Sequence, residues 1–341
     1  MDNDDGNYPF YFRPTNHFVA GMWYEWFVTG NHVIPEFIDG GSPYHQSCYP
    51  VPSDKNCAAA NNHSQGYILW SGKPFVAGIY QTVTVTPCQM YQFQAFARND
   101  ESDYLSKVGI DSYGTRLPAY VSPDGDDLPK NCPPDGKSAC PNPGVSSADA
   151  LPSTITWSPA TSAQNLTWMT HTVASEALST TISVWTYTDS VPGGAEPQSA
   201  YWDNATLTTT TYPDNRLPAP AAWTSSTFIT NVVMLKSSSR VTVTWKTTEA
   251  AIGQVWYERL RSTGVTTSPT AAYTQYFPLI MQNYMAYPFE TTPDTTHVLT
   301  HSAVLSDLKS GDRLTLYILS RHFATDTCKT EVYGPLYVTV P

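Results

Sequence analysis

Short runs in which apolar and polar residues alternate recur along most of the chain. Three examples are AGIYQTVTV (77–85), MYQFQAFAR (90–98) and STTISVWTYTD (179–189), all rich in β-branched and aromatic residues. Gly, Pro, Asn or Asp bounds these runs, and a period of two with such boundaries is typical of antiparallel β-strands. The chain continues in the same way towards its C-terminus, as in RVTVTWKT and DRLTLYILSRH. The pattern predicts an all-β protein.

Two interruptions divide these runs. Residues 120–152 include SPDGDDLPKNCPPDGKSACPNPG, which is too polar to pack and is predicted to be a surface loop. The segment TYPDNRLPAPAAW is rich in proline, which is typical of linkers. With 341 residues, the chain is long enough for two domains. We therefore expect a first domain over 1–212, a linker over 213–223 and a second domain over 224–341.

Charge is distributed unevenly between the two predicted domains. The net charge is −11; residues 1–212 carry 8 Lys and Arg against 20 Asp and Glu (−12), and residues 213–341 carry 10 against 9 (+1). An acidic surface repels phosphate backbones and anionic lipids, which argues against a nucleic-acid or membrane-surface role. No apolar stretch approaches the roughly 20 residues that span a bilayer, so we expect no membrane insertion. Neutral ligands and divalent cations remain as partners.

The six cysteines indicate an oxidising compartment. Cys48 and Cys57 flank one loop-like segment and Cys132 and Cys140 flank another, so we expect each pair to form a local disulfide. Six cysteines allow fifteen connectivities, so the pairing of the remaining two, which would link the domains, is left open. Disulfides predict a secreted or cell-surface protein.

The first domain resembles the jelly rolls of carbohydrate-binding modules and galactose-binding-like domains. The resemblance rests on NHSQGYILW, AGIYQTVTVTPCQMYQFQAFAR, VGID and YWDNATL, and it extends over residues 15–210. One departure is Cys88, which stands where the central hairpin of such modules usually has glycine. Another is the entry segment, which lacks the usual Asn-Pro-Gly-Phe-Glu start. The resemblance implies a jelly-roll sandwich and a carbohydrate ligand.

The second domain is similar to the fibronectin type III-like domain that precedes the catalytic domain of purple acid phosphatases. The residues that carry this similarity are VTVTWKT, GQVWYE, THSAVLSDLKSGDRLTLYILS and VYGPLYVTV. That domain is non-catalytic. The full expectation is therefore an all-β chain of two antiparallel β-sandwiches, a jelly roll followed by a fibronectin or immunoglobulin-like domain.

Positive evidence for catalysis is absent from the sequence. It contains no G-x-S-x-G elbow, P-loop, GxGxxG or HExxH motif. His297 and His301 have a metal-ligand spacing, but they lie in strand-like sequence, which favours hydrogen-bonded or exposed strand histidines. Carboxylates for glycoside hydrolysis would be sought among Glu25, Glu36 and Asp111, for which a structural role is the simpler interpretation. We therefore expect no enzymatic activity.

A sugar-binding surface can be assembled from the alternation, because successive side chains of a strand point to opposite faces. Aromatic rings stack on pyranose rings, and amide and guanidinium groups bond to hydroxyls. Side chains of these kinds occur opposite the aliphatic positions of two runs and form the predicted site: Trp185, Tyr187, Gln94, Phe96 and Arg98. The alternative, in which these aromatics pack under loops or against the second domain, is left open.

The resemblance also implies a structural calcium ion. In related jelly rolls the Asp of the closing strand supplies oxygen ligands, and Asp203 in YWDNATL matches it. Calcium takes hard oxygen ligands, which suits the acidic first half.

Two functional hypotheses from different classes follow. The first is a non-catalytic extracellular protein that binds a polysaccharide or glycan, or acts in adhesion. The alternative is a structural subunit of an extracellular filament or surface layer, which would self-associate. An accessory region of a larger hydrolase is a third interpretation.

Overall fold

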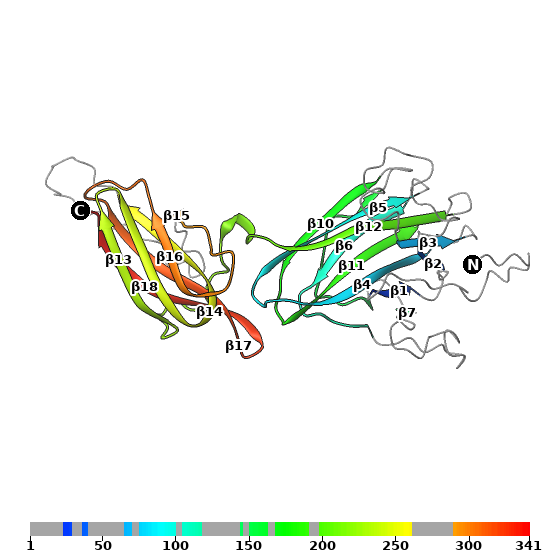
Figure 1. Cartoon of the computed structure of the whole chain (residues 1–341), viewed down its shortest axis with the longest axis horizontal. Coiled ribbons are helices and arrows are strands. Elements are labelled where there is room, and N and C mark those ends of the chain that lie inside the picture. The colour runs from blue at the N-terminus through cyan, green and yellow to red at the C-terminus, as the bar shows by residue number, and fades with distance from the viewer. Residues whose placement is uncertain are drawn as a thin grey trace, which may run out of the picture. The chain divides into compact units, whose positions relative to one another are not determined.

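The computed structural model describes residues 23–28, 36–39, 65–69, 75–99, 104–117, 144–145, 150–162, 168–190, 198–260 and 289–341. The chain divides into two compact units, Met1–Thr210 and Thr211–Pro341 (Figure 1). The regular structure in the described residues is almost entirely β-strand, and the sheets are antiparallel apart from one short parallel pair. The predicted class, all-β with two antiparallel sandwiches, is confirmed. Within the described ranges no helix is long and apolar enough to cross a membrane.

The first unit contains two sheets in the part of the chain that the structure describes. One has seven strands in the order β7-β1-β4-β11-β6-β8, with β9 paired to β6. Its strands are β1 (Tyr24–Val28), β4 (Val76–Thr84), β6 (Tyr104–Asp111), β7 (Gly144–Val145), β8 (Ile155–Trp157), β9 (Thr161–Ser162) and β11 (Thr181–Ser190). The other has five strands in the order β10-β5-β12-β3-β2. Its strands are β2 (Glu36–Asp39), β3 (Gln65–Leu69), β5 (Met90–Asn99), β10 (Met169–Glu176) and β12 (Gln198–Thr209).

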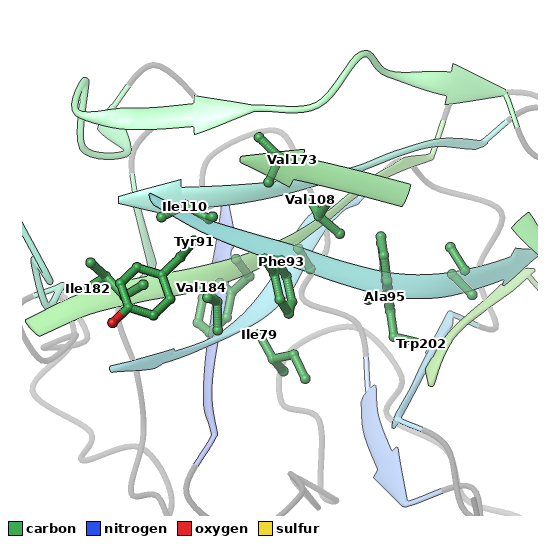
Figure 2. Close-up of a cluster of buried hydrophobic side chains, with 14 of the residues drawn as sticks. Ile79, Tyr91, Phe93, Ala95, Val108, Ile110, Val173, Ile182, Val184 and Trp202 are labelled. Carbon is green, nitrogen blue, oxygen red and sulfur yellow. The ribbon is translucent and has the colours of Figure 1, made fainter. Parts of the chain in front are cut away.

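The core of the first unit lies between these two sheets (Figure 2). From β5 it takes Phe93 and its neighbours at period two, and from β11 it takes Ile182 and Val184. Both sets are the positions at which the alternation predicted inward-facing side chains. The prediction of which side of each strand is buried in the core is therefore confirmed.

In the second unit, one long strand takes part in two sheets. The strands are β13 (Ile229–Ser237), β14 (Arg240–Leu260), β15 (Phe289–Glu290), β16 (Val298–Leu305), β17 (Arg313–Ala324) and β18 (Thr327–Thr339). The first part of β14 pairs with β13 and β16, and its second part pairs with β15 and β17, which in turn pairs with β18. The two sheets enclose a core that includes Trp245, Val255 and Ile318.

The segment expected to be a linker, residues 213–223, is packed on the second unit. Leu217 is 1% exposed. The ring of Trp223 lies 5.7 Å from that of Trp256 and 5.2 Å from that of Tyr317. Trp256 and Tyr317 are partners on β14 and β17, on the side away from the core. The segment therefore covers part of the outer face of that sheet.

Candidate functional site

The predicted sugar-binding residues lie on two different sheets. Trp185 and Tyr187 are on β11 of the seven-stranded sheet, whereas Gln94, Phe96 and Arg98 are on β5 of the five-stranded sheet. Both groups point away from the core between the sheets, so they lie on opposite faces of the sandwich. The expectation that the five share one surface is wrong. Alternation shows which side of a strand faces the core, but it does not show to which sheet the strand belongs.

The outer face of the seven-stranded sheet carries a buried aromatic layer. Its rings belong to Tyr24, Trp26, Tyr80, Trp157, Trp185 and Tyr187. Trp185 is 0% exposed and stacks on Tyr80, with 4.2 Å between ring centroids and 9° between planes. Trp26 donates its indole N–H to the carbonyl oxygen of Thr186 at 3.1 Å. Trp185 and Tyr187 are therefore covered core residues, which is the alternative that the sequence left open.

Two glycines allow this layer to lie directly on the sheet. A Cβ atom at Gly78 would lie 2.0 Å from the carbonyl oxygen of Thr186 and 2.5 Å from Nε1 of Trp26. A Cβ atom at Gly109 would lie 2.5 Å from Ile155 and 2.7 Å from the ring of Trp157. No other residue leaves this space, so the glycines fix where the rings pack.

A cation lies at one edge of the aromatic layer. The Lys107 ammonium lies 4.2 Å from the ring centroid of Tyr187 and 4.6 Å from that of Trp157. Burial lowers the pKa of Lys107, and the nearby Asp189 carboxylate partly opposes that shift. Because Lys107 covers these two rings, they are not presented to a sugar from that side.

The outer face of the five-stranded sheet is different, and we call it the open face. Its central members form three rows across β10, β5 and β12: Thr170–Phe96–Asp203, Thr172–Gln94–Thr206 and Ala174–Gln92–Thr208. The β5 side chains are partly exposed, and the threonines on both sides are exposed. The face therefore combines one accessible aromatic ring with amides, hydroxyls and a carboxylate.

Asp203 reaches the open face at a β-bulge. The register between β12 and β5 shifts between Asp203 and Thr206, and Asn204 has a positive φ of 49°. The Asp203 carboxylate accepts the Asn204 backbone N–H at 2.7 Å. No group of three or more His, Cys, Asp or Glu side chains suited to a metal occurs among the described residues. The described side chains thus do not complete a calcium site around Asp203, and calcium stays a prediction.

Arg98 closes one end of the open face. It is 2% exposed and is paired in register with Tyr201, against which Trp168 packs. Arg98 is therefore buried beside two aromatic rings and does not offer its guanidinium on the surface. Of the five predicted sugar-binding residues, Gln94 and Phe96 are the two that the open face presents.

The structural interpretation of Asp111 is confirmed. Its side chain is buried and accepts the backbone N–H groups of Tyr113 at 3.2 Å and Thr115 at 2.5 Å. Both carboxylate oxygens therefore hold the turn after β6.

His301 is also held by hydrogen bonds, as expected for a strand histidine. Its Nδ1 lies 2.5 Å from the Asp294 carboxylate and its Nε2 lies 3.2 Å from the Thr247 hydroxyl. The ring is buried and stacks on Trp245.

Several predicted residues lie outside what the structure describes. These are the two local cysteine pairs, Cys48 with Cys57 and Cys132 with Cys140, and the side chains of Glu25 and Glu36. Cys88 and Cys328, the cysteines in the described ranges, are both disulfide-bonded.

The sequence-based site missed the threonines that flank β5. In MTHTVASE of β10, Thr170 and Thr172 alternate with buried His171 and Val173. The same alternation, applied to β10 as it was to β5, would have found them. What the sequence could not show is that β10 and β12 are the neighbours of β5.

No protein-family model matches the chain, and no curated protein matches it in sequence. Similar solved structures include TmCBM61 in complex with β-1,4-galactotriose, at 9% identity and a TM-score of 0.31, over 55% of this chain and 88% of that one. The adhesin domain of Epf from Streptococcus pyogenes matches at 9% identity and a TM-score of 0.29, over 81% and 76%. The Endo-D glycoside hydrolase domain from Streptococcus pneumoniae matches at 10% identity and a TM-score of 0.27, over 92% and 37%. At these values the likeness carries no argument about function.

Proposed function

We propose that this chain is a non-catalytic, extracellular glycan-binding protein, with a role in recognition or adhesion, and that the open face takes the glycan. The observation that supports this is one row of that face, in which Phe96 stands between Thr170 and Asp203. Glycan recognition needs an apolar ring with polar groups on either side, and this row offers both.

The chemistry of the neighbouring row suits sugar hydroxyls. The Gln94 amide has donors and an acceptor, and the hydroxyls of Thr172 and Thr206 beside it can do either. The Asp203 carboxylate adds an acceptor. Phe96 can stack on the apolar side of a pyranose ring, as aromatic groups do in small-ligand sites.

The proposed compartment is outside the cell. Disulfides persist in oxidising environments and are rare in the cytosol. Both described cysteines, Cys88 and Cys328, are in disulfides, which supports a secreted or cell-surface location.

A glycan array probed with the full chain tests the proposal. Binding to a glycan should weaken about two- to tenfold in Phe96→Ala, which removes a stacking contact, and in Gln94→Ala, which removes hydrogen bonds, since each kind of contact contributes about 0.5–1.5 kcal/mol and 1.4 kcal/mol is tenfold. Tyr113→Ala is the matched control, because Tyr113 is 49% exposed in the same unit but lies at the turn after β6. Unchanged binding in Phe96→Ala, or equal loss in Tyr113→Ala, would place the site elsewhere.

A further inference from the structure

The second unit has an uncovered sheet face with apolar side chains at its centre. The first part of β14 is flanked by β13 and β16, and their outward residues form two rows: Leu235–Thr242–Val304 and Val233–Thr244–Ser302. Leu235 is 65% exposed, Val233 51% and Val304 48%. We call these six residues the apolar face.

On the other sheet of the same unit, the outer surface is covered by another segment of the chain. There, residues 213–223 place Trp223 on Trp256 and Tyr317, which are 4% and 8% exposed. No described segment lies over the apolar face in the same way. Clustered exposed aliphatic side chains of this kind mark interaction surfaces.

Charge indicates the kind of partner. The rows that continue the apolar face at its two ends carry Arg240 and Lys246, both exposed. None of the side chains in these rows is acidic. The first unit of the chain has the opposite net charge, because residues 1–212 sum to −12 (8 Lys and Arg, 20 Asp and Glu). Complementary charge of this kind steers association and selects partners.

We propose that the apolar face docks a second copy of this chain, through the acidic first unit of that copy. Such a contact joins two different surfaces, so it leaves one of each free on every pair and can continue into a chain of molecules. On the β13 side the contact uses the face of the sheet and not its edge, because β13 carries a bulge between Thr230 and Val233, with Asn231 at a positive φ of 50°. Bulges protect edge strands from pairing with other chains.

Sedimentation velocity of the full chain over a wide concentration range tests the proposal. We expect concentration-dependent association that weakens as salt is added, because salt screens the attraction between opposite charges. Leu235→Glu removes an apolar contact and adds a charge of the wrong sign, and it should weaken association at least about tenfold. Leu260→Glu is the matched control, since Leu260 is 58% exposed at the end of β14 on the other sheet, and it should associate as the parent does.

Arg240→Gln with Lys246→Gln provides a second variant that removes both charges and leaves the apolar side chains in place. It should weaken association and remove its salt dependence. A chain that is monomeric at every concentration overturns the proposal. So does association that strengthens with salt, which would indicate like-charged second units meeting each other, and so does an equal effect of Leu235→Glu and Leu260→Glu.

Discussion

The two outer faces of the first unit are built from strands of similar length and composition, yet only the face on the seven-stranded sheet is buried. Trp185 and Phe96 both occupy outward positions in ten-residue strands. Trp185 is 0% exposed under its neighbours, while Phe96 is partly exposed between threonines. An aromatic residue at an outward position is thus a core residue on one sheet and a candidate ligand contact on the other.

The surroundings of each strand explain the difference. On the seven-stranded sheet, Gly78 and Gly109 leave bare backbone on which the Trp26 and Trp157 rings lie. On the five-stranded sheet, the β10 and β12 neighbours of β5 offer mainly threonine at the outward positions. Burying an apolar surface is favourable, so other parts of the chain pack on it, whereas a hydroxyl-rich surface stays solvated at little cost.

The largest expected effect concerns Trp185. Trp185→Ala should destabilise the first unit by about 3–5 kcal/mol, since it deletes a large ring from a close-packed layer. Phe96→Ala should cost about 1 kcal/mol or less, as is usual for side chains at the surface. Urea unfolding of the full chain, monitored by the fluorescence change of the first unit, measures the loss of stability in both variants. Equal costs in the two variants would mean that the covered and open faces are not distinct.

The second unit also has a covered outer sheet face, and Gln254 lies on it. Its side chain is 0% exposed. Its amide oxygen accepts the backbone N–H of Leu217 at 2.9 Å and the indole N–H of Trp256 at 2.7 Å. Its amide nitrogen donates to the carbonyl oxygens of Asn215 and Thr291, both at 2.6 Å. One side chain therefore fastens the covering segment to the sheet.

Gln254→Ala should destabilise the second unit by about 3 kcal/mol, because each buried polar group left without a partner costs about 1–3 kcal/mol and the segment can partly adjust. Gln92→Ala on the open face is the control and should change stability by about 0.5 kcal/mol or less. Protease digestion would report the local effect as faster cleavage near residue 217. If Gln254→Ala behaves like Gln92→Ala, Gln254 does not hold residues 213–223 on the second unit.

The sequence predicted more about individual strands than about how they assemble. Alternation assigned the inward positions of β5 and β11 correctly because it depends only on the local geometry of a strand. It assigned Trp185 and Phe96 to one surface, because the sequence pattern of a strand does not show which strands pair with it. In the structure β11 pairs with β4 and β6, whereas β5 pairs with β10 and β12. Those pairings join residues that are distant along the chain, so they depend on the whole fold.

The packing of residues 213–223, the expected linker, was not predicted for a related reason. Proline-rich composition in residues 213–223 describes a segment that cannot form a regular strand, and this holds in the structure. Composition does not show whether such a segment is solvated or packed. Leu217 and Trp223 were the available signal, because two large apolar residues in a linker need a surface to cover. The likeness of the second domain to the phosphatase-associated domain stays a prediction beyond the confirmed sandwich.

Acid should lower the stability of the first unit through His171. This residue is 3% exposed, faces the core beside Trp202, and burial lowers its pKa to about 4 from 6.5. The unfolded chain therefore binds a proton at higher pH than the folded chain does. The contribution to stability is complete above about pH 6.5 and is lost as pH falls towards 4, by roughly 3 kcal/mol. His171→Leu should flatten the pH dependence of urea unfolding of the first unit in this window, and an unchanged slope would show that another group titrates.

The smallest expected effect tests whether Asp203, on the open face, binds a cation as well as a glycan. The resemblance to calcium-bearing jelly rolls implies a bound Ca²⁺, and the bulge at Asp203 is a place where a strand leaves its ladder. A cation that binds only the folded state would add about 2.7 kcal/mol at a hundredfold excess over its Kd. Chelator should then lower the unfolding midpoint of the first unit and leave that of the second unit unchanged. Asp203→Asn, which keeps an oxygen to accept the Asn204 N–H, should lower the midpoint by itself and remove the effect of chelator. If the parent chain unfolds at the same midpoint with and without chelator while Asp203→Asn still weakens glycan binding, Asp203 serves the sugar alone and the open face needs no metal.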